Sequence, residues 1–227
     1  RGLAMSRWTE VFSRERMLEH LQWAEERILD EDGDDYLVLD PKKLDDSPRR
    51  VSVRGESFEN WPTDGVELPG AKFTTCRFDR MNFGGSNFNN VDFHGCRFDD
   101  TIMNFTSFDR AVIEKCCFSL TNLVEVAFDQ ARVRDSQFID STLSHGFMAS
   151  SEFCSVVFQG CRLNDVLFRE AVFVDCHFRN TEIERGRFKG VKFIRCEFRN
   201  STPHSKESEP VGWEFEGCFF DENVSKL

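Results

Sequence analysis

The sequence places an apolar residue at every fifth position from Leu68 to Phe198, without a gap. The series extends over 27 consecutive repeats, and most of its apolar residues are Phe. The residue two positions before each of them is small or compact, except at Met81. Polar residues fill most of the other three positions. A period of five fits neither standard element, because it would alternate faces on a strand and rotate side chains by about 140° on a helix. The chain must therefore turn once in every repeat.

A second, longer period sets the number of sides in each coil. Cys76, Cys96 and Cys116 occupy the same place in every fourth repeat, and the apolar centre that follows each of them is Phe. Another phase, from Phe83 to Ile183, is mostly aliphatic. Because like residues recur at this spacing, four repeats form one coil and each side chain stacks on its counterpart in the next. With a rise of about 4.8 Å per coil, the repeats predict about seven coils and a rod of roughly 32 Å.

The repeat unit is a small residue, a polar residue, Phe or Leu, and then two polar residues. Clear examples are Ser-Asn-Phe-Asn-Asn at 86–90, Val-Asp-Phe-His-Gly at 91–95 and Cys-Arg-Phe-Asp-Asp at 96–100. This pattern, which covers residues 66–200, resembles the pentapeptide-repeat family. The resemblance implies a right-handed quadrilateral β-helix, whose hand the periodicity alone does not supply. The predicted fold class is thus an all-β solenoid of about seven four-sided coils, with an N-terminal α-helix and a C-terminal cap.

The two ends of the chain depart from the repeat. We assign residues 1–65 to an N-terminal helix and an acidic linker or cap, 66–200 to the β-helix, and 201–227 to a loop and a C-terminal capping coil. An apolar face without Gly or Pro predicts a helix over 6–29, which either covers the N-terminal end of the rod or binds a partner. The stretch 30–62 is interpreted as a linker. A loop over 201–212 is expected before Trp213 and Phe219-Phe220 close the other end.

The distribution of charge bears on function. The chain has a net charge of −11, yet residues 66–200 come to about −1, because residues 1–65 carry 10 basic against 16 acidic groups and residues 201–227 carry 2 against 6. Some proteins that this family includes protect DNA gyrase by imitating duplex DNA, which requires a strongly negative rod. Because residues 66–200 are nearly neutral, a DNA-mimicking modulator of gyrase or topoisomerase is the alternative hypothesis and not the leading one. We expect neither direct nucleic-acid binding nor membrane association.

No group of residues predicts catalysis, and we expect a protein that is not an enzyme and has no catalytic, cofactor-binding or metal site. Nine cysteines cannot all pair within one chain, so reduced thiols and a cytoplasmic location are expected. Cysteines stacked along one wall form a line, whereas metal ligands must converge on a point. They are interpreted as buried core residues, with Cys117 and Cys154 more accessible. The five histidines lie on different segments or phases, without a metal-binding spacing.

Apolar residues at positions that should face outward give the candidate interaction surface. Ala127, Phe147 and Leu167 recur at every fourth repeat and should stack on one side of the rod. Phe105 and Val124 belong to the neighbouring side, and a second group, Val172, Val174 and Ile194, lies near the C-terminal coils. The full set is Phe105, Val124, Ala127, Phe147, Leu167, Val172, Val174 and Ile194. Such a surface is covered by the chain itself, by a second copy in a homodimer, or by another protein. The leading hypothesis is a non-catalytic interaction or scaffold module whose protein partner is not identified by the sequence.

Overall fold

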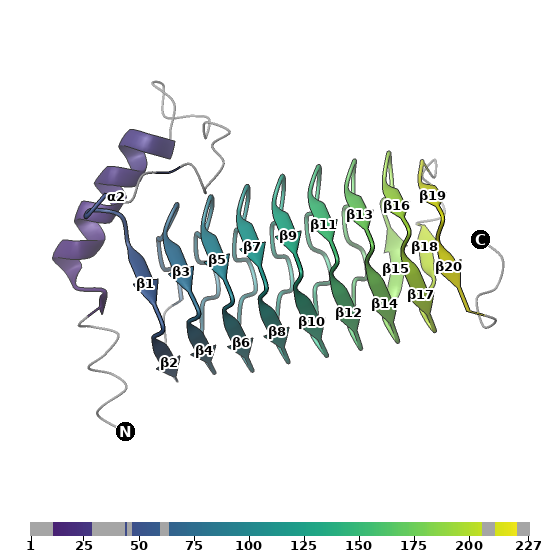
Figure 1. Cartoon of the computed structure of the whole chain (residues 1–227), viewed down its shortest axis with the longest axis horizontal. Coiled ribbons are helices and arrows are strands. Elements are labelled where there is room, and N and C mark those ends of the chain that lie inside the picture. Colours follow the sequence, from purple (N-terminus) through teal and green to yellow (C-terminus); the bar gives the residue numbers. More distant parts are fainter. Residues whose placement is uncertain (1–10, 29–43, 45–46, 60–63, 206–211, 222–227) are drawn as a thin grey trace.

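The computed structural model shows a straight four-sided solenoid with one helix across its N-terminal end (Figure 1). The structure describes residues 11–28, 44, 47–59, 64–205 and 212–221. Parallel strands from successive coils build two of its sides, and short bridges with tight turns build the other two. The fold class expected from the sequence, a quadrilateral β-helix, is confirmed.

Side A is a parallel sheet whose strands are centred on Phe73 and its counterparts. Pairing is in register, so that Phe73 lies opposite Phe93, and the sheet contains nine strands. In order, these are β1 (Ser52–Arg54), β3 (Lys72–Thr74), β5 (Asp92–His94), β7 (Val112–Glu114), β9 (Arg132–Arg134), β11 (Glu152–Cys154), β13 (Val172–Val174), β16 (Lys192–Ile194) and β19 (Glu214–Glu216).

Side B follows side A along the chain and is a second parallel sheet of nine strands. Its central residues are Phe throughout, from Phe58 to Phe220. In order, its strands are β2 (Ser57–Glu59), β4 (Arg77–Asp79), β6 (Arg97–Asp99), β8 (Cys117–Ser119), β10 (Gln137–Ile139), β12 (Val157–Gln159), β14 (His177–Arg179), β17 (Glu197–Arg199) and β20 (Phe219–Phe220).

Sides C and D complete each coil. Side C is centred on Phe83 and the aliphatic residues that follow it at every fourth repeat, and side D is centred on Phe88 and its counterparts. Isolated parallel bridges such as Asn82↔Ile102 on side C and Ala127↔Phe147 on side D link successive coils. Only at the C-terminal end does side C form a two-stranded sheet among the described residues, from β15 (Ile183–Gly186) and β18 (Pro203–Ser205).

The solenoid is longer than the sequence pattern indicated. It begins at β1 and β2, which pair with β3 and β4 in the same register as later coils, so Val51 to Glu59 belong to the first coil and not to a linker that ends before residue 66. Val51 and Phe58 are buried like any later core residue. Nine strands on a side correspond to about eight turns instead of about seven.

The interior is filled by columns of aromatic rings. On side B, Phe118, Phe138 and Phe158 stack with centroids 4.8 and 5.2 Å apart and nearly parallel planes. Rings on adjacent sides meet edge to face, as Phe93 and Phe98 do at 5.2 Å and 86°. Both arrangements are favourable for aromatic quadrupoles, and each is worth about 0.5–1.5 kcal/mol beyond area burial. The Phe residues of the repeat therefore gain from neighbours along and across the coil.

The small residues two places before each centre also satisfy backbone groups. Thr101 Oγ1 donates to the carbonyl of Phe78 at 2.8 Å, and Thr181 Oγ1 donates to that of Phe158 at 3.0 Å. Cys161 makes the same contact from its Sγ atom to Phe138 at 3.2 Å. A buried carbonyl without a partner would cost about 1–3 kcal/mol. Ser, Thr and Cys recur at this position because they are compact and donate hydrogen bonds.

The fifth residue of the repeat makes the turn. This position takes a positive φ of 46–72° in every repeat from Gly65 to Asn200, and again at Gly217, but not at Ser205. Eight of the residues with positive φ are Gly, including Gly217 after a change of register near the C-terminus, but 22 are not, and these include the bulky Phe105 and Leu120. Left-handed backbone once per repeat lets the chain turn a corner in every repeat, as the period of five required.

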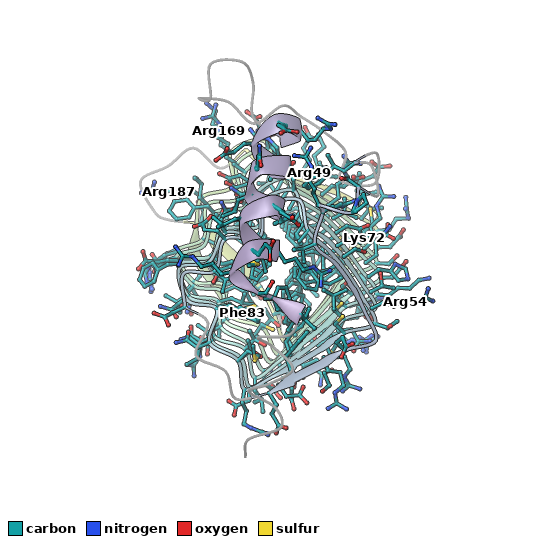
Figure 2. The ribbon with its side chains drawn as sticks, turned by 90° about the vertical axis from the view of Figure 1, so that its left-hand side faces the viewer. Arg49, Arg54, Lys72, Phe83, Arg169 and Arg187 are labelled. Atoms are coloured by element: carbon teal, nitrogen blue, oxygen red, sulfur yellow. The ribbon has the colours of Figure 1, made fainter. Side chains whose placement is uncertain are left out.

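Helix α2 (Arg14–Ile28) covers the N-terminal end of the solenoid (Figure 2). Ser13 begins it as an N-cap, because its Oγ accepts the amide of Arg16 at 3.3 Å. The helix predicted over 6–29 is thus interrupted at Ser13, and its residues 6–10 and 29 lie outside the described residues. Phe12, just before the cap, packs its ring 5.6 Å from that of Phe58. His20 Nδ1 accepts the amide of Val51 at 3.0 Å.

The C-terminal coil departs from the predicted loop over 201–212. Ser201 and Pro203 continue the repeat, with both side chains buried and β18 paired with β15. The spacing between register partners then lengthens by two positions, since Phe193 lies opposite Phe215. The ring of Trp213 lies 4.7 Å from that of Phe188 at an interplanar angle of 53°, and Phe220 stacks 4.8 Å from Phe198. Trp213 and Phe220 therefore pack on the last full coil as expected, whereas Phe219 is 52% exposed.

Candidate interaction surface

The outward row of side D brings together the central residues of the predicted surface. Ala127, Phe147 and Leu167 form consecutive parallel bridges, so their side chains follow one another along the solenoid. Phe147 is 44% exposed, whereas Ala127 and Leu167 are half-buried. The next residue in the row is Arg187. The stacking deduced from the longer period is therefore present, and we call these three apolar residues the side D stripe.

A hollow of about 360 Å³ lies beside the stripe, at the corner between sides C and D. Phe147 and Leu167 form its apolar wall, and charged residues from the corner column form much of the rest. Its lining residues are His145, Gly146, Phe147, Asp165, Leu167, Arg185 and Arg187. The hollow therefore combines exposed apolar area with nearby charges, which is the composition of many protein-binding surfaces.

Asp165 and Arg185 form a bidentate ion pair at the edge of this hollow. Arg185 Nη2 and Nε donate to the two carboxylate oxygens at 2.7 and 3.0 Å. This pairing raises the pKa of Arg185. His145 Nδ1 lies 4.0 Å from the same carboxylate. The pair holds the guanidinium in place next to the apolar wall, so the polar edge of the hollow is preorganised.

The second row of side D carries a ladder of carboxylates that have a structural role. Asp109 Oδ1 accepts the amide of Asp129 at 3.0 Å, and Asp129 Oδ1 accepts that of Ala149 at 2.7 Å. Burial raises the pKa of both acids, and for Asp109 the nearby carboxylate of Asp129 adds to the shift. Farther along this side, basic residues replace the acids. Arg169 and Arg187 lie on the same flank of the solenoid (Figure 2).

Phe105 and Val124 lie on side C or at its corner, apart from the stripe. Phe105 is 57% exposed, and it adopts a left-handed φ of 59°. Two exposed apolar side chains that the sequence prediction omitted lie on or beside this side, Ile102 at 44% and Leu120 at 59%. Their outward positions follow from the same repeat phase, so the sequence pattern alone indicates that both are exposed. The structure therefore adds Ile102 and Leu120 to the apolar residues of side C.

The second predicted group lies on side A. Val174 is the register neighbour of Cys154 on one side and of Ile194 on the other, and Val172 lies on the same strand as Val174. Val172, Val174 and Ile194 are each half-buried, so none of the three is fully exposed. They form a short column on a different side from the stripe. The predicted set thus comprises separate apolar groups, as the repeat phases indicated.

The cysteine ladder has the geometry of a core element. Cys96 Sγ lies 3.5 Å from the carbonyl of Phe73. The neighbouring Cys96 thiol, followed by burial, raises the pKa of Cys76, whereas burial is the larger cause of the raised pKa of Cys176. Cys117 and Cys154 are half-buried, which confirms that they are more accessible than the ladder. Within the described ranges, no group of three or more His, Cys, Asp or Glu side chains is placed to hold a metal ion.

The fold and its outward rows define a four-sided parallel β-solenoid that carries surface residues on a repetitive core. The family model for pentapeptide repeats matches residues 67–104, 86–123 and 161–200. The chain is a pentapeptide-repeat protein. No curated protein matches the sequence significantly.

Two solved structures show how far the likeness extends. The trypsin-treated form of QnrB1, a plasmid-mediated fluoroquinolone resistance protein, is 16% identical, with a TM-score of 0.50 over 75% of this chain and 84% of that one. HetL, a pentapeptide-repeat protein involved in heterocyst differentiation regulation in the cyanobacterium Nostoc, is 11% identical, with a TM-score of 0.31 over 74% and 84%. At these identities the likeness to QnrB1 concerns the fold alone.

Proposed function

We propose that this protein is a non-catalytic interaction module that docks a protein partner on the side D stripe and its adjoining hollow. The observation that carries the proposal is the in-register stack of Ala127, Phe147 and Leu167, with Phe147 exposed beside a hollow with a charged edge. A solenoid holds such a row rigid, so little conformational entropy is lost when a partner binds. Exposed apolar rows with polar edges are typical of contact surfaces.

The chemistry of the row indicates what kind of partner fits. Arg187 continues the stripe and Lys189 lies on the same repeat, so basic groups follow the apolar residues toward the C-terminal coils. A partner segment with apolar side chains followed by carboxylates would match this order. A second copy of the chain is the competing occupant. We place the interaction in the cytoplasm, a proposal that the nine free thiols support. No helix in the described part of the chain has the length and apolarity needed to cross a membrane.

Charge does not favour the DNA-mimic alternative. Residues 66–200 have a net charge of about −1, and the C-terminal coils expose Arg185, Arg187 and Lys189. A surface that competes with duplex DNA needs a dense array of negative charge. The likeness to QnrB1 therefore supplies a fold without the electrostatic property that mimicry requires.

The test compares a double variant of the stripe with a matched control on another side. Phe147→Asp with Leu167→Asp places two carboxylates on the stripe, and Ile139→Asp with Val157→Asp places two at half-buried outward positions of side B. Affinity capture from native cell extract is followed by identification of the bound proteins. We expect the stripe variant to lose a partner that the wild type and the control retain.

Analytical ultracentrifugation of the same proteins separates a homodimer from a different partner. A wild-type dimer that the stripe variant alone converts to monomer would identify a second copy as the occupant. Circular dichroism melts show whether each variant still folds. If a folded stripe variant retains every partner and the wild-type mass, the proposed surface is wrong.

A further inference from the structure

Four successive coils of side C present an outward face without charged residues. Each coil places the residues before and after its central residue outward, and the eight such residues between positions 82 and 144 are all uncharged. They are Asn82, Gly84, Ile102, Asn104, Asn122, Val124, Thr142 and Ser144. At the equivalent positions of side A, the same coils carry Lys72, Asp92, Glu114, Arg132 and Arg134. Because 30% of the residues in the chain are charged, this face is a local exception.

Large apolar side chains are exposed on this face and at both of its edges. Ile102 lies on the face, Leu120 at the corner with side B and Phe105 at the corner with side D, and all three are exposed. Val124 lies beside Phe105, whose amide donates to the carbonyl of Val124 at 3.0 Å. Two adjacent coils therefore carry three of the six exposed large apolar side chains among the described residues. Exposed apolar groups gathered in this way mark a contact surface.

The absence of charge on this face favours a second copy of the chain as its occupant. A two-fold interface brings the same surface of both copies together, so a charged residue near the axis meets a charge of its own sign. This repulsion matters here, because each copy has a net charge of −11. On side C, two copies can approach with only uncharged groups at the centre of the contact.

The apolar groups are self-complementary when two rods lie antiparallel. A two-fold axis that crosses side C between the coil of Ile102 and the coil of Leu120 places each column of residues against the same column of the second copy, with the order of the coils reversed. Ile102 then lies next to Leu120 of the second copy. In the same way, Phe105 lies next to Val124 of the second copy. Symmetry repeats both contacts, so apolar pairs lie on both sides of the axis.

The charges at the edge of the face agree with the antiparallel direction. The corner between sides B and C carries, in successive coils, Arg80, Asp100, Leu120 and Asp140. Reversal of the coil order places Arg80 opposite Asp140 of the second copy. It also places Asp100 opposite Leu120, so no carboxylate in this column faces another. Arg80 pairs with Glu59 in its own chain as well, and the two carboxylates would share its guanidinium. Rods that ran in the same direction would not bring Arg80 and Asp140 together, because each corner would then face the corner with side D.

We propose that this part of side C, from Asn82 to Ser144, is the contact face of an antiparallel homodimer. The face is only one repeat wide, so the contact is smaller than a standard protein interface and the dimer should be weak. Side D of both copies lies outside the contact, so this proposal does not rest on the partner surface proposed above.

Sedimentation equilibrium of the full chain tests the proposal directly. At total concentrations from about 5 to about 500 µM, we expect a reversible monomer–dimer equilibrium with a dissociation constant on the order of 10–100 µM. A monomer at every concentration, or an assembly larger than a dimer, would overturn the proposal.

Leu120→Asp places a carboxylate opposite Asp100 of the second copy. Ser155→Asp is the matched control at the corner between sides A and B, because both residues are exposed and have left-handed φ values of 53° and 54°. We expect dimer affinity to fall about tenfold or more for Leu120→Asp and to stay unchanged for Ser155→Asp. Ile102→Asn is a milder second variant, since the residues on both sides of it in its column are already Asn. If both folded side C variants dimerise like the wild type, the proposed face is wrong.

Asp140→Lys tests the direction of the rods, because it places a lysine opposite Arg80 of the second copy. Asp135→Lys is matched in residue type, exposure and left-handed φ, which is 49° at both positions, and it changes the net charge equally. We expect the dimer of Asp140→Lys to be several-fold weaker than that of Asp135→Lys. Equal affinities would contradict the antiparallel arrangement.

The stripe variant separates this proposal from the proposed function. Phe147→Asp with Leu167→Asp should dimerise like the wild type, and Leu120→Asp should retain the partner that the stripe captures. Loss of the dimer in the stripe variant alone would place the second copy on side D and would rule out the side C contact. Circular dichroism melts establish that each variant folds.

Discussion

Replacing Lys115 by Gly should stabilise this protein, although it deletes a whole side chain. Lys115 is exposed at a corner with a left-handed φ of 55°, and the structure gives its side chain no hydrogen bond or ion pair with a described residue. Left-handed backbone costs a residue other than Gly about 1–2 kcal/mol. Gly removes that cost, but its greater conformational freedom stabilises the unfolded state by about 0.4–1 kcal/mol. The net expectation is a gain of roughly 0.5–1 kcal/mol in the free energy of unfolding.

Lys189→Gly is the matched control, because Lys189 is also exposed but is absent from the residues with positive φ. At such a position Gly brings only its entropic penalty, so the free energy of unfolding should fall by roughly 0.5–1 kcal/mol. Lys115→Ala retains the left-handed strain and should change little. Equilibrium urea unfolding followed by circular dichroism measures all three, provided that the slopes agree. If Lys115→Gly lowers the urea midpoint as Lys189→Gly does, left-handed backbone strain at the corners does not reduce the stability of the protein.

Two further predictions concern pH and function. The pKa of His20 is about 4 in the folded protein and about 6.5 in the unfolded chain, so the unfolded chain binds the proton more tightly. The contribution of neutral His20 to the free energy of unfolding is therefore complete above pH 6.5 and decreases as the pH falls toward 4. As the pH falls across that window, the urea midpoint should decrease by an amount that corresponds to a few kcal/mol at most. His20→Asn should flatten this pH dependence. A variant with the same pH dependence as the wild type would contradict the role of His20. In a supercoiling assay with purified gyrase and a quinolone, micromolar protein should have no effect, and protection of the enzyme would restore the DNA-mimic hypothesis.

Most of the solenoid was predictable, because its core obeys one rule at every position. The period of five indicated the corners and the longer period indicated the stacking of Ala127, Phe147 and Leu167, as the bridges confirm. The ends were less predictable. Phe58 keeps the repeat phase, but polar Thr63 falls at the next central position, so the first coil was assigned to a linker. At the other end, Pro203 occupies a central position normally held by Phe or Leu, which concealed one more repeat.

The positions of side chains outside the repeat could not be deduced in the same way. Exposure at Ile102 and Leu120 follows from phase, and a complete search of outward positions would have found both. The packing of the cap is different in kind. Phe12 and His20 do not belong to a column of like residues, and they meet Phe58 and Val51 only because α2 packs across the first coil. Repeat phase says nothing about where a non-repeating helix docks.

This difference bears on where function resides in a solenoid. A core in which every column contains equivalent residues gives each coil nearly the same backbone, so it cannot by itself distinguish one coil from the next. Specific recognition must come from departures from the repeat. Here the clearest departure is a short apolar row on side D, which Ser107 precedes and Arg187 follows. The row is rigid, because parallel bridges between successive coils hold it. A partner that docks on it therefore loses conformational entropy mainly in its own segment.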